Sequence, residues 1–599
     1  MARCSGLRVS LDTETNGLLW YKNHIIGYGL WCPDAGLAGY LPAQKTSTRA
    51  AAIEAVTAWA PGTTVIGQNL KFDLHMLGID PATTDWKLID TAVLAHLVDS
   101  RLQKKLDQLE RTFLGANSKR HHVTTAPNRP IWEWPLENIA DYCINDARVT
   151  YDLAELLVRK AVELRLWNLF RKEMEYLKLL WRIERRGIQS SPEFINRALA
   201  RLSEDIKAPE QRLFDEIGYT DAYGNSTGFN WRSHQKLSKA LYDDYGWERP
   251  VNPFADEDGV DRTKFAINGK YNSTLTDSFI LMEKAHHPLG ELVLHLREID
   301  KLKDYLMDYR KFCSEDRVVH TNLNLTGTRT GRLASKEPNL QNIPSEIRSR
   351  AVTSVFSDDV QRRVEEYNLR KALVARPGHV FVSIDYRQME MRMFGVLARE
   401  PKMLESLRAG RDIHSDNAFM VWGLRDDVHR EWSKTIGFGL IYGMTTGSLQ
   451  FRLNMTKEQA YGVTDQYWGA FPRVQPWLRE VARECRANGF VRYWSGRIWR
   501  EELDMFMYKA ANALIQGGCA DLLSVAVIRS DEYLRRNSCG GIVDIIHDEI
   551  LFEIPEAEVG DHSRNLAHLM EVPDLLDIPF FTDIKIGPSY GDLAKVKEL

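Results

Sequence analysis

Two stretches of the sequence place carboxylates where a metal ion could be held. Residues 380–384 form a short apolar run, rich in β-branched residues, that predicts a buried strand ending at Asp385. Farther along, two β-rich runs are interrupted by His547-Asp548-Glu549, without the Gly, Asn or Pro usual in turns. Two aspartates from separate strands could hold two Mg²⁺ ions about 3.5–4 Å apart, an arrangement that serves phosphoryl transfer. The alternatives are a strand that ends at a solvated aspartate and an ordinary surface turn.

Between these stretches, Arg430, Lys434, Phe438 and Tyr442 recur at every fourth residue. On a helix this spacing forms one face, with two cations followed by two aromatic rings. Such a face suits a nucleoside triphosphate, because the cations can bind phosphates and the rings can stack on a base. The alternative is an amphipathic helix with a cationic end. Three glycines in the same stretch weaken that alternative, since each costs a purely structural helix about 0.8–1 kcal/mol.

A second set of acids lies near the N-terminus. A strand-like run ends in Asp12 and Glu14, which share a face, and a cation between them would relieve their repulsion. Asp73 follows shortly after another strand-like run, and Tyr142 and Asp146 share a face of a predicted helix. A chance Asp-x-Glu pair and a half-buried helix tyrosine are the alternatives.

The three C-terminal stretches, in this order, resemble motifs A, B and C of family A DNA polymerases, the bacterial polymerase-I-like and phage replicative enzymes. The matching segments are Asp385-Tyr-Arg-Gln-Met-Glu-Met-Arg392, Arg430-x3-Lys434-x3-Phe438-x3-Tyr442-Gly443 and His547-Asp548-Glu549. The N-terminal acids, together with Tyr142, resemble the three motifs of the DEDD 3′–5′ exonucleases in the subtype with tyrosine. The resemblance covers nearly the whole chain and implies a template-directed DNA polymerase with a proofreading exonuclease.

The resemblance also implies roles for individual residues. Two Mg²⁺ ions at the polymerase site would be held by Asp385 and Asp548, with Glu549 as a third catalytic acid. Two Mg²⁺ ions at the exonuclease site would be held by Asp12, Glu14, Asp73 and Asp146, while the water that attacks would be oriented by Tyr142. The nucleotide would be bound by Arg430, Lys434, Phe438, Tyr442, Glu390, Gln388 and His414. DNA would be contacted by Arg332, Gln341, Asn342, Asn512, Gln516, His547 and Arg392.

Two of these roles concern selection of the correct substrate. Glu390 would fill the space that a ribose 2′-hydroxyl needs. Arg332 would reach the minor groove of the terminal base pair, whose acceptors are nearly common to all four pairs.

The sequence departs from the family at three places. Arg387 stands where serine is common in motif A, and Tyr508 replaces an arginine that contacts the template. The segment 345–368 is longer than usual and rich in arginine and acidic residues. A solvated helix and a DNA-contacting insertion are both open interpretations of that segment.

Length and composition are those of a multidomain globular protein. The chain has 599 residues, and 44% of them are apolar. Its net charge is −4, and its seven cysteines are scattered without a Cys-x2-Cys pair. We therefore expect a reducing compartment and no structural zinc. The expected fold class is α/β and α+β multidomain, with a mixed-sheet, ribonuclease-H-like exonuclease domain followed by a right-hand polymerase domain. The expected boundaries are 1–165 for the exonuclease, 166–325 for the thumb and connecting helices, 326–399 and 496–599 for the palm, and 400–495 for the fingers.

The expected partners are primer–template DNA and deoxynucleoside triphosphates, with a helicase or a single-strand-binding protein as candidate accessory proteins. We expect a cytoplasmic monomer (in the host cytoplasm if phage-encoded), without a signal peptide and without an apolar run near the ~18 residues of a membrane helix. We also expect no thioredoxin-type processivity insertion among the thumb helices and no 5′-nuclease region before Asp12. These features favour a phage-type replicase.

Two other functions compete with this interpretation. A single-subunit RNA polymerase shares motifs of this kind, but Glu390, the His-Asp-Glu turn and the exonuclease motifs oppose it. A nucleic-acid-binding scaffold with inactive sites is opposed by the presence of every expected carboxylate. Primer extension in Mg²⁺ with deoxy- and ribonucleotides separates the three functions.

Overall fold

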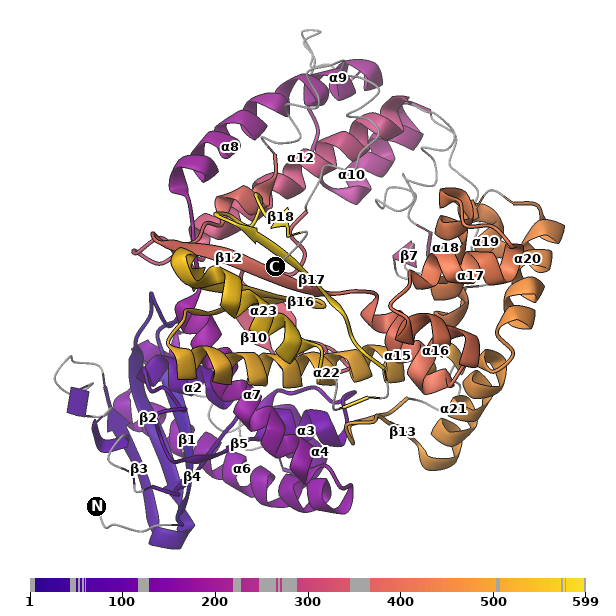
Figure 1. Cartoon of the computed structure of the whole chain (residues 1–599). Coiled ribbons are helices and arrows are strands. Elements are labelled where there is room, and N and C mark those ends of the chain that lie inside the picture. The colour runs from indigo at the N-terminus through magenta and orange to yellow at the C-terminus, as the bar shows by residue number, and fades with distance from the viewer. Residues whose placement is uncertain are drawn as a thin grey trace.

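The computed structural model describes residues 6–43, 50–51, 54–56, 59, 61–116, 129–218, 228–246, 266–267, 270–271, 288–344, 367–444, 446–453, 455–501, 507–572, 575–576 and 578–596. All but the last two residues of the segment 345–368 lie outside these ranges. Figure 1 shows the described elements, with the N-terminal sheet at the lower left, a second sheet in the centre and two helical groups beside it.

The N-terminal part is a five-stranded mixed sheet in the order β3-β2-β1-β4-β5. Its strands are β1 (Arg8–Thr15), β2 (Ile25–Cys32), β3 (Leu37–Pro42), β4 (Thr64–Gly67) and β5 (Lys87–Asp90). Strands β1, β4 and β5 run parallel, whereas β2 is antiparallel to both β1 and β3. The helices here are α2 (Leu70–Leu77), α3 (Thr91–Val98), α4 (Leu106–Leu114) and α6 (Leu136–Glu163). Helix α6 packs across β1 to β4, which confirms the predicted mixed α/β arrangement.

The next segment leads away from this sheet through helix α7 (Trp167–Arg186). The helical group that follows contains α8 (Pro192–Asp205), α9 (Lys207–Ile217), α10 (His234–Ser238) and α12 (Pro288–Lys311), with a π-helical turn η3 (Lys239–Asp244) after α10. Helix α12 packs against α8 and α9 around a shared apolar cluster. The short strands β7 (Ala266–Ile267) and β8 (Lys270–Tyr271) pair with each other.

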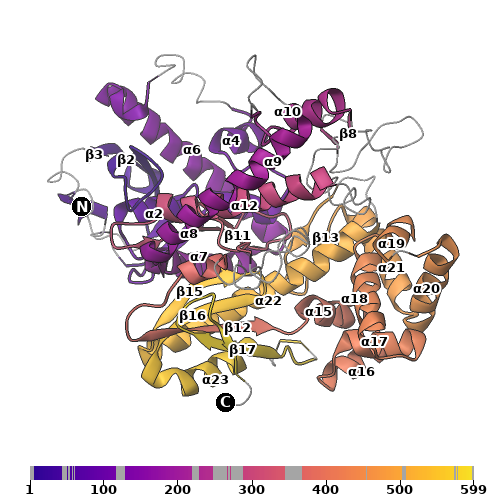
Figure 2. The ribbon, with the colours of Figure 1, turned by 90° about the horizontal axis from the view of Figure 1, so that it is seen from above.

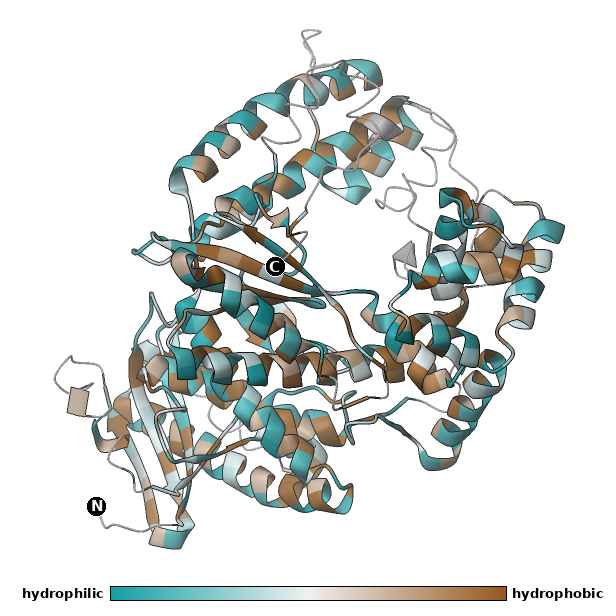
Figure 3. Ribbon diagram, viewed as in Figure 1, coloured by the Kyte–Doolittle hydropathy of each residue, from teal (hydrophilic) through white to brown (hydrophobic). Residues whose placement is uncertain are grey.

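The second sheet has the order β15-β16-β12-β17-β18, and all of its neighbouring strands are antiparallel. Its strands are β12 (His379–Tyr386), β15 (Gly541–Ile546), β16 (Glu549–Pro555), β17 (Thr582–Gly587) and β18 (Ala594–Lys595). Figure 3 shows mainly apolar residues along the strands of this sheet and stripes of apolar residues on the helices around it. Two small pairs connect it to the preceding parts: β6 (Ile188–Gln189) with β9 (Val318–Val319), and β10 (Asn322–Asn324) with β11 (Ala334–Lys336).

In the sequence, the second helical group lies between β12 and the strands β15 to β18, which together build this sheet. It contains α15 (Met389–Ala398), α16 (Pro401–Arg408), α17 (Ile413–Trp422), α18 (Asp427–Ile441), α19 (Thr446–Leu453), α20 (Lys457–Ala470) and α21 (Val474–Asn488). The hairpin of β13 (Val491–Arg492) and β14 (Ile498–Trp499) leads back to the sheet. Figure 2 shows this group on the opposite side of β12 and α22 from the N-terminal sheet. The helix predicted from the four-residue spacing is α18, although Tyr442 follows its last residue.

Helix α22 (Met507–Asn537) is the longest helix described. By length and composition alone, Tyr508–Asn537 could cross a membrane, which corrects the expectation that no apolar run is long enough. Its most apolar 18-residue stretch is 72% buried inside the protein, as expected for a core helix. It packs against α7, α15, α21 and α23 (Val559–Met570), the last covering the second sheet.

A buried ion cluster fixes α22 to α7 and to the β13–β14 hairpin. Arg497 Nη2 lies 2.7 Å from Asp521 Oδ1 on α22 and 2.8 Å from Glu173 Oε1 on α7. All three side chains are at most 5% exposed. Burial alone would raise the pKa of Asp521, but Arg497 and Lys172 outweigh it and hold that pKa well below its usual value. Lys172 Nζ also lies 3.2 Å from Glu173 and 3.3 Å from Asp521, so Arg497 supplies the fully buried part of their charge compensation and Lys172 the rest.

We expect Arg497→Met to destabilise the fold strongly, because it leaves two buried carboxylates to share the partly exposed Lys172. Breaking a buried pair on one side costs about 3–5 kcal/mol, which thermal unfolding followed by circular dichroism would register as a lower Tm. Arg479→Met is the matched control, since Arg479 is exposed on α21 and donates to Gln475 Oε1 at 3.1 Å. Equal Tm values for the two variants would contradict the structural role of Arg497.

Candidate active sites

Asp385 lies next to the end of β12, directly between Glu549 on β16 and Asp583 on β17. Asp583 is compensated by Arg387, whose Nε lies 2.6 Å from Asp583 Oδ1, so the arginine that departs from the family pattern forms an ion pair here. Burial raises the pKa of Asp385 to about 7, and the charges of Glu549 and Asp548 act in the same direction. Like charges on neighbouring strands are unfavourable unless a cation lies between them. This corner of the sheet therefore suits a cation.

The predicted acidic hairpin is the β15–β16 connection, with His547 and Asp548 as its two-residue loop. His547 adopts a positive φ of 55°, which tight hairpin loops require and which glycine or asparagine usually supplies. The amide of Tyr386 donates to the carbonyl of Asp548 at 3.2 Å and thus ties the loop to the end of β12. Burial raises the pKa of Asp548, whereas the nearby charge of Arg332 opposes the rise. The loop thus brings Asp548 beside Asp385, as the sequence predicts.

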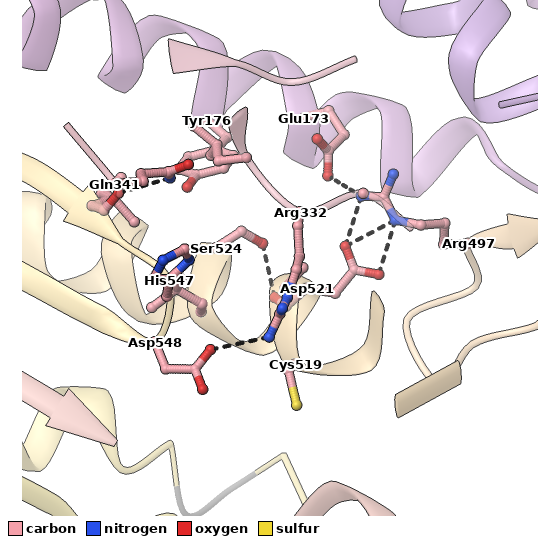
Figure 4. A pocket seen from close by; sticks show the side chains of 15 residues that line it. Glu173, Tyr176, Arg332, Gln341, Arg497, Cys519, Asp521, Ser524, His547 and Asp548 are labelled. Carbon is pink, nitrogen blue, oxygen red and sulfur yellow. Dashed lines mark hydrogen bonds and ion pairs between the residues drawn. The ribbon is translucent and has the colours of Figure 1, made fainter. Parts of the chain in front are cut away.

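Arg332 links several of the predicted residues. Its Nη2 lies 2.6 Å from Glu390 Oε1 and 3.5 Å from Asp548 Oδ1. The hydroxyl of Tyr442 donates to Glu390 Oε2, and Gln516 Nε2 donates to the Tyr442 hydroxyl at 3.3 Å. Arg332 and Asp548 line a cleft together with residues of α7 and α22, and Figure 4 shows the two side chains facing each other there. Five residues predicted separately from distant motifs therefore form one connected cluster.

Two more of the predicted DNA-binding residues line the same cleft. Gln341 and His547 line it, and Gln341 Nε2 donates to the Ile545 carbonyl at 2.9 Å. Asn342 is exposed, and its carbonyl accepts from Tyr305 of α12 at 2.7 Å. Asn512 is half-buried on the face of α22 that also carries Gln516.

Arg392 contradicts its predicted role in DNA binding. It is only 1% exposed, inside the interface between α15, α16 and the C-terminal segment. Its guanidinium donates to three carbonyls, at 3.0 Å to Arg387, 3.1 Å to Leu407 and 2.8 Å to Pro579. The motif spacing could not reveal this burial, because arginine is usually exposed. Arg392 is thus a structural residue that holds α15 in place.

The predicted nucleotide-binding face lies on α18, opposite the N-terminus of α17. Arg430 Nε lies 2.7 Å from Asp412 Oδ2, and Gln388 Nε2 donates to Asp412 Oδ1 at 2.6 Å. Lys434 is exposed beside Glu431, at 3.8 Å. His414 is buried, and burial lowers its pKa to about 4. Phe438 belongs to α18, but its side chain lies outside the described part of the structure.

The N-terminal acids gather on β1 where α6 crosses it. Asp12, Glu14 and Cys143 offer ligand atoms that all lie within 4.8 Å of one another. Asp12 pairs with Gly29 on β2, and a side chain at Gly29 would meet the Cys143 backbone at 2.6 Å. Glycine at this position therefore lets α6 approach the sheet closely. The two carboxylates fit a cation, whereas the Cys143 thiol donates to Asp12 Oδ2 at 3.5 Å and keeps its proton, because burial raises its pKa.

Asp73, Tyr142 and Asp146 lie around this group. Asp73 Oδ1 accepts hydrogen bonds from the amide of Thr13 at 3.0 Å and from its hydroxyl at 2.6 Å. Burial raises the pKa of Asp73 to about 7. Asp146 is buried on α6, and the Tyr142 ring contacts Trp134 edge-on at 5.8 Å. Neither Asp73 nor Asp146 is part of the 4.8 Å group among the described residues, so the four-carboxylate cage stays a prediction.

Sequence reasoning missed two residues of these sites. Asp412 caps α17 and binds Arg430, and its only local signal was an aspartate before an apolar helical run. Cys143 faces the Asp12 carboxylate at 3.5 Å, and nothing in its spacing distinguishes it from a core cysteine.

Comparisons with known proteins agree with this geometry. Residues 193–592 match the family model described as DNA polymerase family A, and residues 2–161 match a 3′-5′ exonuclease model. DNA polymerase I of Borreliella burgdorferi is 25% identical over 98% of this chain and 62% of its own length. DNA polymerase I of Chloroflexus aurantiacus is 27% identical over 98% of this chain and 61% of its own length.

This chain thus spans about three-fifths of the length of those relatives. Among solved structures, the POL domain of Pol1 from M. smegmatis, in complex with DNA primer-template and dNTP, superposes with a TM-score of 0.78 at 25% identity. That match covers 98% of this chain and 96% of the other. The expected two-part fold and the family resemblance are thereby confirmed. The chain belongs to DNA polymerase family A and carries an N-terminal 3′-5′ exonuclease domain.

Proposed function

We propose that this protein extends primer 3′ ends on a DNA template with deoxynucleoside triphosphates and removes mispaired ends with its exonuclease. The observation that carries the proposal is the meeting of Asp385, Asp548 and Glu549 at one corner of the second sheet, beside the Arg332–Glu390–Tyr442 cluster. The family and the solved complex with primer-template and dNTP support it.

The donor set at the polymerase site fits Mg²⁺, which prefers carboxylate and phosphate oxygens. Asp385 and Asp548 would hold two ions, with Glu549 as a further acid. Burial, together with repulsion from the neighbouring acids, raises the pKa of Asp385, and the ions would relieve that repulsion. When bound, such ions activate the primer hydroxyl and neutralise the leaving pyrophosphate.

The residues around these acids would orient the two substrates. Arg430 and Lys434 would bind the triphosphate, with Asp412 and Gln388 aligning Arg430 before the nucleotide arrives. Glu390 is already braced by Arg332 and Tyr442, which gives it the fixed position that a sugar-selecting side chain needs. Arg332 would extend from this cluster toward the minor groove of the primer end.

At the exonuclease site, Asp12, Glu14, Asp73 and Asp146 would hold two further Mg²⁺ ions and Tyr142 would orient water, as the resemblance implies. The grouping of Asp12 with Glu14 supports this assignment. We propose the thumb for 166–325, the fingers for 400–495 and the palm for the second sheet and its helices. A phage-type replicative role stays a prediction, which strand synthesis on a long primed template would test.

The two activities should be separable, because their acids lie on different sheets. Asp12→Ala with Glu14→Ala should reduce 3′-end degradation more than about a hundredfold, since several kcal/mol of charge stabilisation is lost. The same variant should extend primers normally, and Asp548→Ala should show the reverse. Degradation and extension of one labelled primer would be measured for both variants. Loss of both activities in either folded variant would refute two independent sites.

Glu390→Ala should raise the use of ribonucleotides relative to deoxynucleotides. The side chain leaves no room for a 2′-hydroxyl, and an unsatisfied buried polar group adds about 1–3 kcal/mol to the penalty. We therefore expect the ratio of kcat/KM values to shift about ten- to a hundredfold. Glu405→Ala, which changes an exposed glutamate of α16, is the control and should leave the ratio unchanged. A wild-type preference for ribonucleotides would favour an RNA polymerase instead.

Mg²⁺ should activate extension at lower concentration as pH rises. With a pKa near 7, the Asp385 carboxyl holds a proton at pH 6 that the metal must displace, and it is ionised at pH 8. The half-saturating Mg²⁺ concentration should fall about tenfold over this range, as expected for one competing proton. Glu549→Gln removes the charge that raises this pKa most after burial, so its curve should move to lower pH. A concentration independent of pH would contradict the assignment of Asp385 as a ligand.

A further inference from the structure

A buried ion cluster joins the helix that carries Asp73 to α7. Lys71 and His75 are four residues apart on α2, on the face opposite Asp73. Lys71 Nζ donates to Glu184 Oε1 on α7, and His75 Nε2 lies 2.6 Å from Glu184 Oε2. The Glu184 and His75 side chains are each 3% exposed and that of Lys71 is 9% exposed. One carboxylate therefore binds both polar side chains of this helix face.

The same carboxylate also contacts β10, which belongs to the polymerase half of the chain, residues 193–592. The amide of Leu323 on β10 donates to Glu184 Oε1 at 2.5 Å, and the Leu323 carbonyl accepts from Lys71 Nζ at 2.5 Å. The Glu184 carbonyl also lies 2.8 Å from His320 Nδ1. Glu184 is thus a junction between α2, α7 and the strand that precedes Arg332.

The ring of His75 is held in one orientation and one tautomer. Arg185 Nε donates to His75 Nδ1 at 3.2 Å, so the proton must lie on Nε2, which donates to Glu184. The ring is stacked between Trp20 and Trp181, with centroids at 5.1 and 5.3 Å and interplanar angles of 8° and 14°. These contacts prevent α2 from rotating about its axis.

The opposite face of α2 carries Asp73 and contacts the strand that carries Asp12 and Glu14. Asp73 binds both the amide and the hydroxyl of Thr13, and Thr13 lies between Asp12 and Glu14 on β1. A shift of α2 would therefore move Asp73 and change its contact with the strand that carries the other two acids.

Resting on the exonuclease function proposed above, we propose that Glu184 is a positioning residue for the exonuclease site. It fixes α2, and with it Asp73, against the polymerase half of the chain, and it touches neither substrate nor metal. The affinity of the exonuclease acids for Mg²⁺ therefore depends on a contact with the polymerase half. Without the carboxylate, Lys71 would be a buried charge without compensation, and α2 would shift to expose it.

The test compares wild type with Glu184→Gln in the full-length chain. We expect the half-saturating Mg²⁺ concentration for degradation of a single-stranded oligonucleotide to rise at least about fivefold, because Asp73 is no longer aligned. Primer extension should change less than about twofold. In metal-free buffer, amide hydrogen exchange in α2 should accelerate, whereas exchange in α18 should not. Glu175→Gln on the exposed side of α7 is the matched control and should change none of these values.

Lys71→Met with Glu184→Gln keeps the proposal testable if Glu184→Gln does not fold, because it removes both charges together. This pair should show the same selective loss of Mg²⁺ affinity. Unchanged Mg²⁺ dependence in the variant that folds, or equal loss of degradation and extension, would overturn the proposal. Asp73→Asn separates the two levels of inference. If the wild type degrades no 3′ ends, the exonuclease assignment itself is wrong, and if Asp73→Asn leaves degradation intact, Asp73 is not one of its acids. Abolished degradation in Asp73→Asn together with a normal Glu184→Gln variant refutes only the role of Glu184.

Discussion

Repulsion between carboxylates that are held close together and partly out of water constrains the structure around both sites. At the second sheet, β12 and β16 bring Asp385 and Glu549 opposite each other, and the adjacent loop adds Asp548. Such a corner is stable only if cations share it. Arg387 compensates Asp583 next to it, and Arg332 compensates Asp548, whereas Asp385 keeps a raised pKa. The protein thus neutralises the edges of the cluster and leaves its centre suited to metal ions.

Backbone geometry decides how closely these acids can approach. The β15–β16 loop needs a left-handed residue, and His547 takes that conformation at the point where Asp548 must turn toward β12. In the N-terminal sheet, Gly29 removes the side chain that would otherwise separate α6 from the strand beside Asp12. Both sites are therefore built on strands and helices and not on long loops, which gives their side chains fixed positions.

Local patterns in the sequence predict most of the elements and the order of the sites, because strands and helices have short periods. The acids at 12, 14, 385 and 548 could be found because they end apolar runs. Arg392 and Glu184 could not be interpreted in this way. Arg392 donates to carbonyls that lie 15 and 187 positions away in the sequence. Glu184 binds Lys71, which lies 113 positions away. Charged side chains look exposed in a sequence, and only tertiary contacts show which of them are buried.

Helix α7 connects these observations. Glu173 and Glu184 are eleven residues, or about three turns, apart, so they lie on nearly the same line along the helix. Glu173 binds Arg497 next to the polymerase cleft, and Glu184 binds Lys71 next to the exonuclease site. Apolar contacts tolerate sliding, because they have no preferred direction, whereas a buried ion pair with several hydrogen bonds is satisfied in one register only. Two such pairs on one helix therefore fix the distance and the rotation between the exonuclease sheet and α22.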